Sequence, residues 1–251
     1  MVLIGVSLIR LSERRKVGFR NRFSENGRWR LTQWAGIDPL RKEYRVSTTN
    51  REVLLYIDPT CPYAWVTSRW LLNAVKERPE FTPRFSIMSL YVLNEGRDLD
   101  PNYRALIDQT LSPAHLFMAV QRELGQEAFS KLYTAWGERF HVQDRKDDYL
   151  EVARESLEEA GIDASYLEHW EGRTYEGELR EEQAKVQKMV GDDVGTPVIS
   201  FGSGTAYFGP VLTRAPRGEE AGALLDGLAA MSTVRGFAEL KRARTGGLDF
   251  S

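Results

Sequence analysis

The sequence is poor in the residues that build disulfides and metal sites. Cys61 is the one cysteine among 251 residues, so no disulfide can form within the chain and thiolates cannot build a zinc site. The three histidines lie too far apart in the sequence to suggest a local metal motif. These absences exclude a secreted domain held together by disulfides, and a reducing compartment is the simplest setting for a lone thiol. We therefore predict a cytoplasmic protein that holds no metal.

Long apolar runs and a strong charge of one sign are also missing. No run of 18 or more apolar residues occurs, and the apolar start of the chain lacks the preceding positive charge and the cleavage site of a secretory signal. The formal net charge is −2, which gives no reason to expect a nucleic acid. We expect neither a membrane nor a nucleic acid as partner, and the sequence leaves a homodimer open.

The first 50 residues differ from the rest of the chain. They hold eleven Lys and Arg against four Asp and Glu and show no sustained period, so we expect residues 1–50 to form a basic N-terminal extension outside the main domain. One interpretation is an arm for an acidic partner. We favour a poorly ordered tail, because dispersed arginines without a helical pattern are usually just solvated. The sequence does not tell whether the mature protein keeps this segment.

The rest of the chain predicts a sheet interrupted by helices. Apolar and alternating runs predict strands over 53–57 and 81–90, joined by a helix over 63–78 as a βαβ unit. Only helical patterns follow between 94 and 190, one of them opening at Ser112-Pro113. A hairpin over 198–208, a helix over 216–231 and a short helix with Phe237 and Leu240 complete the prediction. The fold class is thus α/β, with one domain from residues 51–93 and 191–251 and a helical insertion over 94–190.

Cys61 is the first candidate for chemistry. It lies between a predicted buried strand and the start of a predicted helix, and Pro62 suits the first helical turn. Backbone N–H groups and the positive end of the helix dipole favour a thiolate there, so we predict a lowered pKa and a nucleophilic sulfur. A lone cysteine is more often a small buried hydrophobe, but this position between strand and helix reverses that preference.

Thr196-Pro197 is the second candidate, since a proline that begins a strand after Gly-Thr often marks a fixed backbone geometry. The sequence leaves the cis or trans state of this bond open. Together with Cys61 it resembles the thioredoxin fold, in which a cis-proline loop faces the reactive cysteine and offers backbone groups to an extended thiol substrate.

Longer segments make the resemblance specific. DPTCPYAW (58–65), SLYVLNEGRDL (89–99), GDDVGTPVISF (191–201), AYFGPVLTRAPRGEEAG (206–222) and FAELKRAR (237–244) resemble the DsbA-like thioredoxin-fold proteins with a helical insertion. The family that we can name is the actinobacterial mycothiol-dependent nitroreductases. The resemblance covers residues 52 to about 250 and implies a thiol-dependent oxidoreductase with mycothiol as cosubstrate, acting on an electrophilic or disulfide substrate.

The sequence departs from that family at the second cysteine. The family has Cys-Pro-Trp-Cys, whereas this chain has Cys61-Pro62-Tyr63-Ala64. Without a resolving thiol, Cys61 cannot form an internal disulfide, which leaves monothiol chemistry with an external thiol. Two alternatives stay open. In a transferase or isomerase of the kappa glutathione-transferase type, the position of Cys61 would activate the thiol of the cofactor; in a binding module, no turnover would occur.

Other residues complete the predicted site. Cys61 is the expected catalytic residue, and Thr196 and Pro197 are the expected binding loop. Tyr63 and Trp65 flank the thiol, and Trp65 could equally pack the first helix onto the sheet. Arg217 could bind a carboxylate of the thiol cosubstrate or lie free on the surface. The complete set of expected binding residues is Pro62, Tyr63, Trp65, Thr196, Pro197 and Arg217.

Overall fold

The computed structural model describes residues 51–202, 204–244 and 246–250. The predicted extension over 1–50 lies outside the described residues. The described chain begins with β1 (Arg51–Ile57), α1 (Pro62–Glu77) and β2 (Phe81–Ile87), in which β1 and β2 pair in parallel. The predicted βαβ unit is therefore confirmed. It places the start of α1 at the end of a buried strand.

Two short strands complete the sheet after a long helical stretch. β3 (Val198–Ser200) pairs antiparallel with β1 and with β4 (Ala206–Phe208), so the strand order is β2-β1-β3-β4. This mixed order, with the βαβ unit on one side and the hairpin on the other, is that of a thioredoxin-like sheet, which confirms the predicted fold class. The residues of β1 alternate between two apolar clusters: Val53, Leu55 and Ile57 enter one, and Leu54 and Tyr56 the other.

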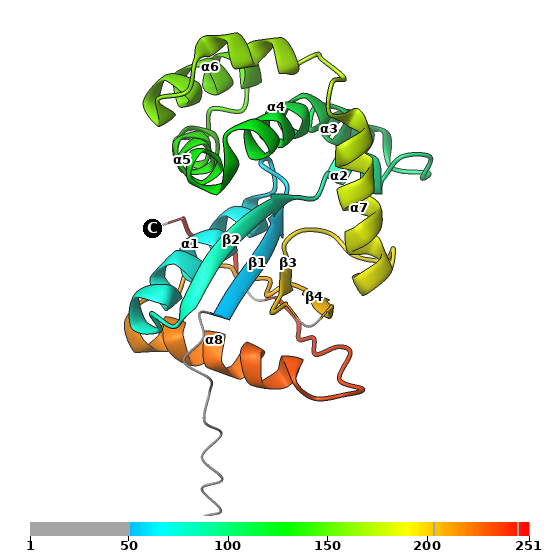
Figure 1. Ribbon diagram of the computed structural model, residues 1–251. Coiled ribbons are helices and arrows are strands. Elements are labelled where there is room, and N and C mark those ends of the chain that lie inside the picture. Colours follow the sequence, from blue (N-terminus) through cyan, green and yellow to red (C-terminus); the bar gives the residue numbers. More distant parts are fainter. Residues whose placement is uncertain (1–50, 203, 245, 251) are drawn as a thin grey trace, which may run out of the picture. The chain divides into compact units, whose positions relative to one another are not determined.

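Only helices occur between residues 94 and 190. They are α3 (Pro101–Asp108), α4 (Leu111–Glu123), α5 (Gly125–Gly137), a π-helical turn (Glu138–Val142), α6 (Tyr149–Ala160), a 3₁₀ turn (Ala164–His169) and α7 (Glu176–Val190). Figure 1 shows α3–α6 gathered beyond one end of the sheet, with α7 beside β3 and β4. The predicted boundaries of a separate insertion stay a prediction.

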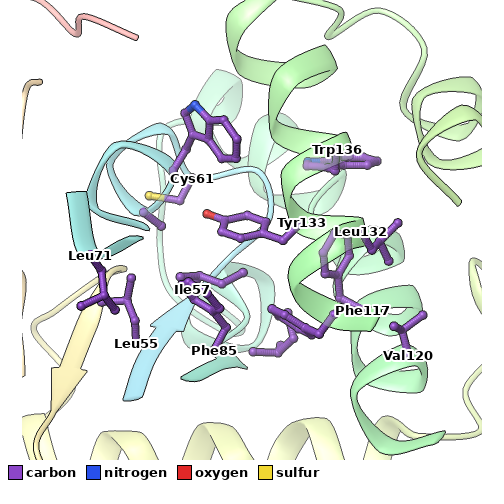
Figure 2. Close-up of a cluster of buried hydrophobic side chains, with 14 of the residues drawn as sticks. Leu55, Ile57, Cys61, Leu71, Phe85, Phe117, Val120, Leu132, Tyr133 and Trp136 are labelled. Carbon is purple, nitrogen blue, oxygen red and sulfur yellow. The ribbon is translucent and has the colours of Figure 1, made fainter. Parts of the chain in front are cut away.

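Aromatic rings fill the core of the helical stretch and join it to the sheet. Phe117, Leu132, Tyr133 and Trp136 belong to the same apolar cluster as Ile57 of β1 and Phe85 of β2. Figure 2 shows the Tyr133 ring pointing from its helix towards Cys61 and Ile57. Two glutamines also cover the outer edge of β2. The Gln126 side chain bonds both the N–H and the C=O of Phe85, and the Gln121 oxygen accepts from the N–H of Ile87. The edge strand is thereby capped without a further strand.

The last helix, α8 (Gly218–Ser232), packs against α1. The Trp70 ring nitrogen donates to the Ala221 carbonyl at 3.1 Å. The Arg78 guanidinium bonds Glu219 and Asp226 and lies over Gly222, where a Cβ would stand 2.7 Å from its Nη1. A side chain at position 222 would therefore push the Arg78 guanidinium aside. Together these contacts hold the C-terminal half of α1 against α8.

Several local predictions are wrong. The second strand ends at Ile87 instead of residue 90, because the Ser89 hydroxyl accepts from Val92 N–H and starts the short helix α2 (Leu90–Leu93). α4 begins at Leu111, so Ser112 lies inside its first turn and does not cap it. The expected helix around Phe237 and Leu240 is absent from the described residues, and Leu240 is exposed. The first two errors lie at the ends of elements, where local contacts decide between alternatives.

Candidate functional site

The loop between β1 and α1 is built around a buried carboxylate. Asp58 is fully buried at the end of β1. One of its oxygens accepts from the N–H and hydroxyl of Thr60, and the other from Leu90 N–H at 2.8 Å. Burial raises the pKa of Asp58 to about 6, although these three donors oppose the shift. The carboxylate fixes the turn that delivers Cys61 to the start of α1.

The helical stretch holds the same loop from the other side. The Pro59 carbonyl accepts from the Trp136 ring nitrogen at 2.9 Å and bonds His141 Nε2 at 3.0 Å. Burial lowers the pKa of His141 to about 3, so the ring is neutral at pH 7 and its Nε2 carries the proton. Two ring donors from a distant segment therefore position the residues just before the cysteine.

Cys61 is the N-cap of α1 and Pro62 is the first helical residue, as the sequence predicts. The cysteine is 7% exposed, and its sulfur donates to the Thr196 carbonyl at 3.3 Å. Burial raises the pKa of the Cys61 thiol, although the backbone N–H groups of Tyr63 and Ala64 favour the anion. The predicted lowered pKa is therefore wrong: loss of water around the sulfur outweighs the helix end, and the resting thiol is protonated.

Thr196 and Pro197 lie directly opposite the cysteine, across 135 residues of sequence. Their peptide bond is cis. The Pro197 carbonyl accepts from Gly209 N–H at 2.7 Å, which links this loop to the end of β4. The Thr196 hydroxyl is buried and has no hydrogen-bond partner among the described residues. The loop therefore offers one occupied carbonyl and one unused hydroxyl beside the sulfur.

Tyr133 is a residue at this site that sequence reasoning did not single out. Its side chain comes from α5 and is fully buried, and Figure 2 shows its hydroxyl on the edge of the ring that faces Cys61. That hydroxyl also has no partner within the described part of the chain. Burial raises the pKa of Tyr133, so the phenol stays neutral. Its helical spacing marked it as core, and that pattern carries no information about where the hydroxyl points.

Trp65 and Tyr63 differ in surroundings. Trp65 is 1% exposed, stacks on His141, meets Tyr133 edge-on and lies under the Arg69 guanidinium at 4.0 Å. It thus packs α1 against the helical stretch. Tyr63 is half-buried, with the Arg244 guanidinium 5.1 Å from its ring.

A pocket of about 500 Å³ lies along α1, one turn beyond the thiol. Trp65 forms part of its wall together with Arg69 and Arg217. Cys61, Thr196 and Pro197 are not among its lining residues. The structure therefore divides the predicted site residues into two groups, one around the sulfur and one around this pocket.

Two further features bear on function. Among the described residues, no group of three or more His, Cys, Asp or Glu side chains could hold a metal ion. None of the described helices is long and apolar enough to cross a membrane.

A comparison with models of protein families identifies the family of this chain. The family model described as Rv2466c-like, mycothiol-dependent nitroreductase Rv2466c, matches residues 60–242, a span that includes Cys61, Thr196-Pro197 and Arg217. The chain belongs to this family. The Rv2466c-like match covers most of the chain, and it confirms the resemblance drawn from the sequence. Membership also places the chain among thiol-dependent oxidoreductases.

Individual relatives are more distant. The chain is 26% identical over 194 residues to the uncharacterised protein Rv2286c of Mycobacterium tuberculosis, covering 76% of this chain and 81% of that protein. It is also similar to solved structures of a putative protein disulfide isomerase from Nitrosomonas europaea (15% identity, 72% of this chain and 98% of the other, TM-score 0.46) and a probable DsbA oxidoreductase from Streptomyces coelicolor (15%, 77% and 94%, TM-score 0.46). At these scores neither structure supports a statement about function.

Proposed function

We propose that this member of the Rv2466c-like family is a monothiol oxidoreductase that acts through Cys61 and uses mycothiol as cosubstrate. The observation that carries the proposal is the contact of one thiol, at the start of α1, with the Thr196 carbonyl opposite it, while a buried alanine occupies position 64. A second thiol is absent from the whole sequence. The resolving step therefore needs a thiol from outside the chain.

The proposed step is an exchange between a thiol and a disulfide. Cys61 sulfur attacks one sulfur of a bound disulfide, forms a mixed disulfide, and the leaving sulfur departs as a thiol with the Cys61 proton. A second, external thiol then attacks the mixed disulfide and restores the free cysteine, its own proton passing to Cys61. The sum is one disulfide and one thiol consumed and one of each formed, so no electrons are left over.

Reduction of a nitro compound would draw on the same site. Two molecules of thiol supply two electrons and two protons, and the products are a nitroso compound, one disulfide and one water. Cys61 would act as the carrier between the two thiols. We propose this reaction from the family, since the described residues show no group that identifies a nitro substrate.

The groups around the sulfur fit a small thiol ligand. The Thr196 and Tyr133 hydroxyls are buried and unpartnered among the described residues. Buried polar groups normally have hydrogen-bond partners. A ligand with polar groups would satisfy them while its sulfur lies at Cys61. The residues that would hold the cosubstrate are thus Thr196, Pro197 and Tyr133.

A transferase or isomerase is the second candidate. The observation that favours it is the protonated, buried state of the Cys61 thiol. Such a thiol can donate a hydrogen bond to the sulfur of a bound cofactor and thereby stabilise it as a thiolate, without being modified itself. Serine can do the same, so activity that survives Cys61→Ser would support this function over the monothiol exchange.

Intact-protein mass spectrometry after incubation with oxidised mycothiol tests the leading proposal. We expect one mycothiol adduct on the wild type, removed by free mycothiol, and none on Cys61→Ala. In Ala64→Cys, which restores the second cysteine, we expect an internal disulfide with the loss of two hydrogens in place of the adduct. Absence of an adduct on the wild type at every pH up to 9 would contradict the proposal.

A further inference from the structure

Arg69 differs from the other partly buried arginines of the protein. Arg78, Arg139 and Arg180 each contact two carboxylates. Arg69 instead bonds only the hydroxyls of Ser68 and Thr134, at 3.2 and 3.0 Å. No carboxylate lies within 4.0 Å of its guanidinium among the described residues. The protein thus gives its other shielded arginines direct ion pairs, whereas the charge on Arg69 is opposed only from a longer distance, by Glu138.

Because Arg69 is shielded from water, its lack of a direct ion pair is energetically unfavourable. The central carbon of its guanidinium lies over the Trp65 ring, 4.0 Å from the ring centre. Loss of water lowers the pKa of Arg69, whereas carboxylates raise the pKa values of Arg78 and Arg180. A shielded charge without a partner is unfavourable, and neutral hydroxyls compensate it only in part. A bound anion would supply the missing interaction.

The pocket beside Arg69 has the size and the charge balance for such an anion. Its volume of about 500 Å³ falls within the range of small-molecule sites. Arg69, Lys76 and Arg217 line it against two acidic residues, Glu138 and Asp249. The balance of one positive charge matches a carboxylate better than a doubly charged phosphate.

Apart from Asn73, the remaining wall is apolar. Val66 and Leu72 come from α1, and Phe250 comes from the C-terminal segment. That segment is held by a backbone hydrogen bond from Asp249 N–H to the Thr213 carbonyl at 2.7 Å. The pocket therefore combines charged groups, with a balance of one positive charge, with aliphatic and aromatic walls.

Its position relates it to the thiol. Arg69 follows Cys61 by eight residues on α1, which corresponds to about 12 Å along the helix axis. Trp65 stands between them and belongs to both sites. We propose that this pocket binds the carboxylate of a small apolar acid, with Arg69 as its counter-ion, and that this acid is the substrate reduced at Cys61. The second half of this proposal rests on the function proposed above; the existence of the carboxylate site does not.

Calorimetric titration with a matched pair of probes tests the site. 4-Nitrobenzoate and 4-nitrobenzamide have nearly the same shape and differ in charge. We expect the wild type to bind the benzoate on the order of tenfold more tightly, the effect of one charge-assisted hydrogen bond. Arg69→Met should abolish the difference, Arg69→Lys should keep part of it, and Arg84→Gln, which removes an exposed arginine of β2, should change nothing.

A second variant tests the site independently in case Arg69→Met does not fold. Lys76 and Arg217 are exposed, so the double variant Lys76→Gln, Arg217→Gln lowers the charge of the pocket without touching the core. It should weaken benzoate binding several-fold and leave amide binding unchanged. Equal binding of the two probes to the wild type, or no measurable binding of either at millimolar concentration, overturns the carboxylate site.

The same probes distinguish carboxylate binding in the pocket from reduction of the substrate at Cys61. With mycothiol present, the proposed substrate role predicts consumption of two thiols per 4-nitrobenzoate, with a lower KM than for the amide. Charge-selective binding without turnover overturns the substrate role and the proposed nitro reduction and leaves the carboxylate site standing. Turnover of both probes with equal KM values overturns the carboxylate site and leaves the Cys61 chemistry standing.

Discussion

The two regions along α1, one around Cys61 and one beside Arg69, differ in the charge of their polar groups. Around Cys61 the polar groups are neutral: a protonated thiol, the hydroxyls of Thr196 and Tyr133, and a neutral His141 nearby. Beside Arg69 the polar groups are charged and line an open pocket. The comparison teaches that one helix can serve two kinds of chemistry when a buried tryptophan separates them. In the functions proposed above, sulfur exchange would take place away from water, and recognition of charge would take place at the pocket beside Arg69.

The largest effect on stability is expected from replacing Trp65, which lies between the two regions. Trp65 is packed between Tyr133, His141 and Arg69, so Trp65→Ala should lower the free energy of unfolding by about 3–5 kcal/mol. Urea denaturation followed by circular dichroism measures this loss. Trp70→Phe, a milder change on the same helix, serves as the control. A loss below 1 kcal/mol would show that Trp65 does not hold the two regions apart.

Asp58 is a buried acidic group close to Cys61, and its protonation should affect stability. Its pKa is about 6 in the folded protein and 3.8 when unshielded, so the folded state binds the proton more tightly. Stability should therefore fall as pH rises from about 4 to 6, by on the order of 3 kcal/mol. Denaturation midpoints across this range measure the slope.

In Asp58→Asn the slope should disappear. The variant should also be less stable at low pH, because an amide nitrogen facing Leu90 N–H cannot accept its hydrogen bond. A slope of unchanged size in this variant would assign the titration to another group.

The reactivity of Cys61 should follow the raised pKa of its thiol. We expect the rate of alkylation by iodoacetamide to rise about tenfold per pH unit from pH 7 to 9, without reaching a plateau. The thiolate fraction sets this rate, and the pKa lies above 9.0. Mass spectrometry over a time course measures the rate, with free N-acetylcysteine as reference. A plateau below pH 8 would mean that the helix end outweighs burial after all.

The smallest effect on stability is expected from Tyr133→Phe. Its hydroxyl is buried and unpartnered among the described residues, so its removal should raise the free energy of unfolding by about 1 kcal/mol. The same change should slow adduct formation at Cys61, because the ligand loses a partner. Tyr166→Phe is the matched control, since its hydroxyl bonds Glu123 at 2.7 Å and its loss should not stabilise. Unchanged adduct formation in Tyr133→Phe would remove Tyr133 from the site.

The sequence determined the local parts of this protein. The apolar run before Asp58, the proline after Cys61 and the hairpin around residues 202–204 all report on neighbours within a few residues, and the structure confirms the strand, the helix start and the hairpin. Long segments were enough to identify the family that the family model then matched. Errors gathered at element ends, such as Ser89, where one side-chain hydrogen bond decides the outcome.

Only the tertiary structure decided how the site works. The Thr196 carbonyl reaches Cys61 across 135 residues, and Trp136 and His141 reach Pro59 from the helical stretch. These contacts also bury the thiol, so the pKa of Cys61 rises where the helix end alone would lower it. Desolvation depends on everything that surrounds a group. A local pattern fixes the position of a residue in its helix or strand, but the fold sets the charge that residue can carry.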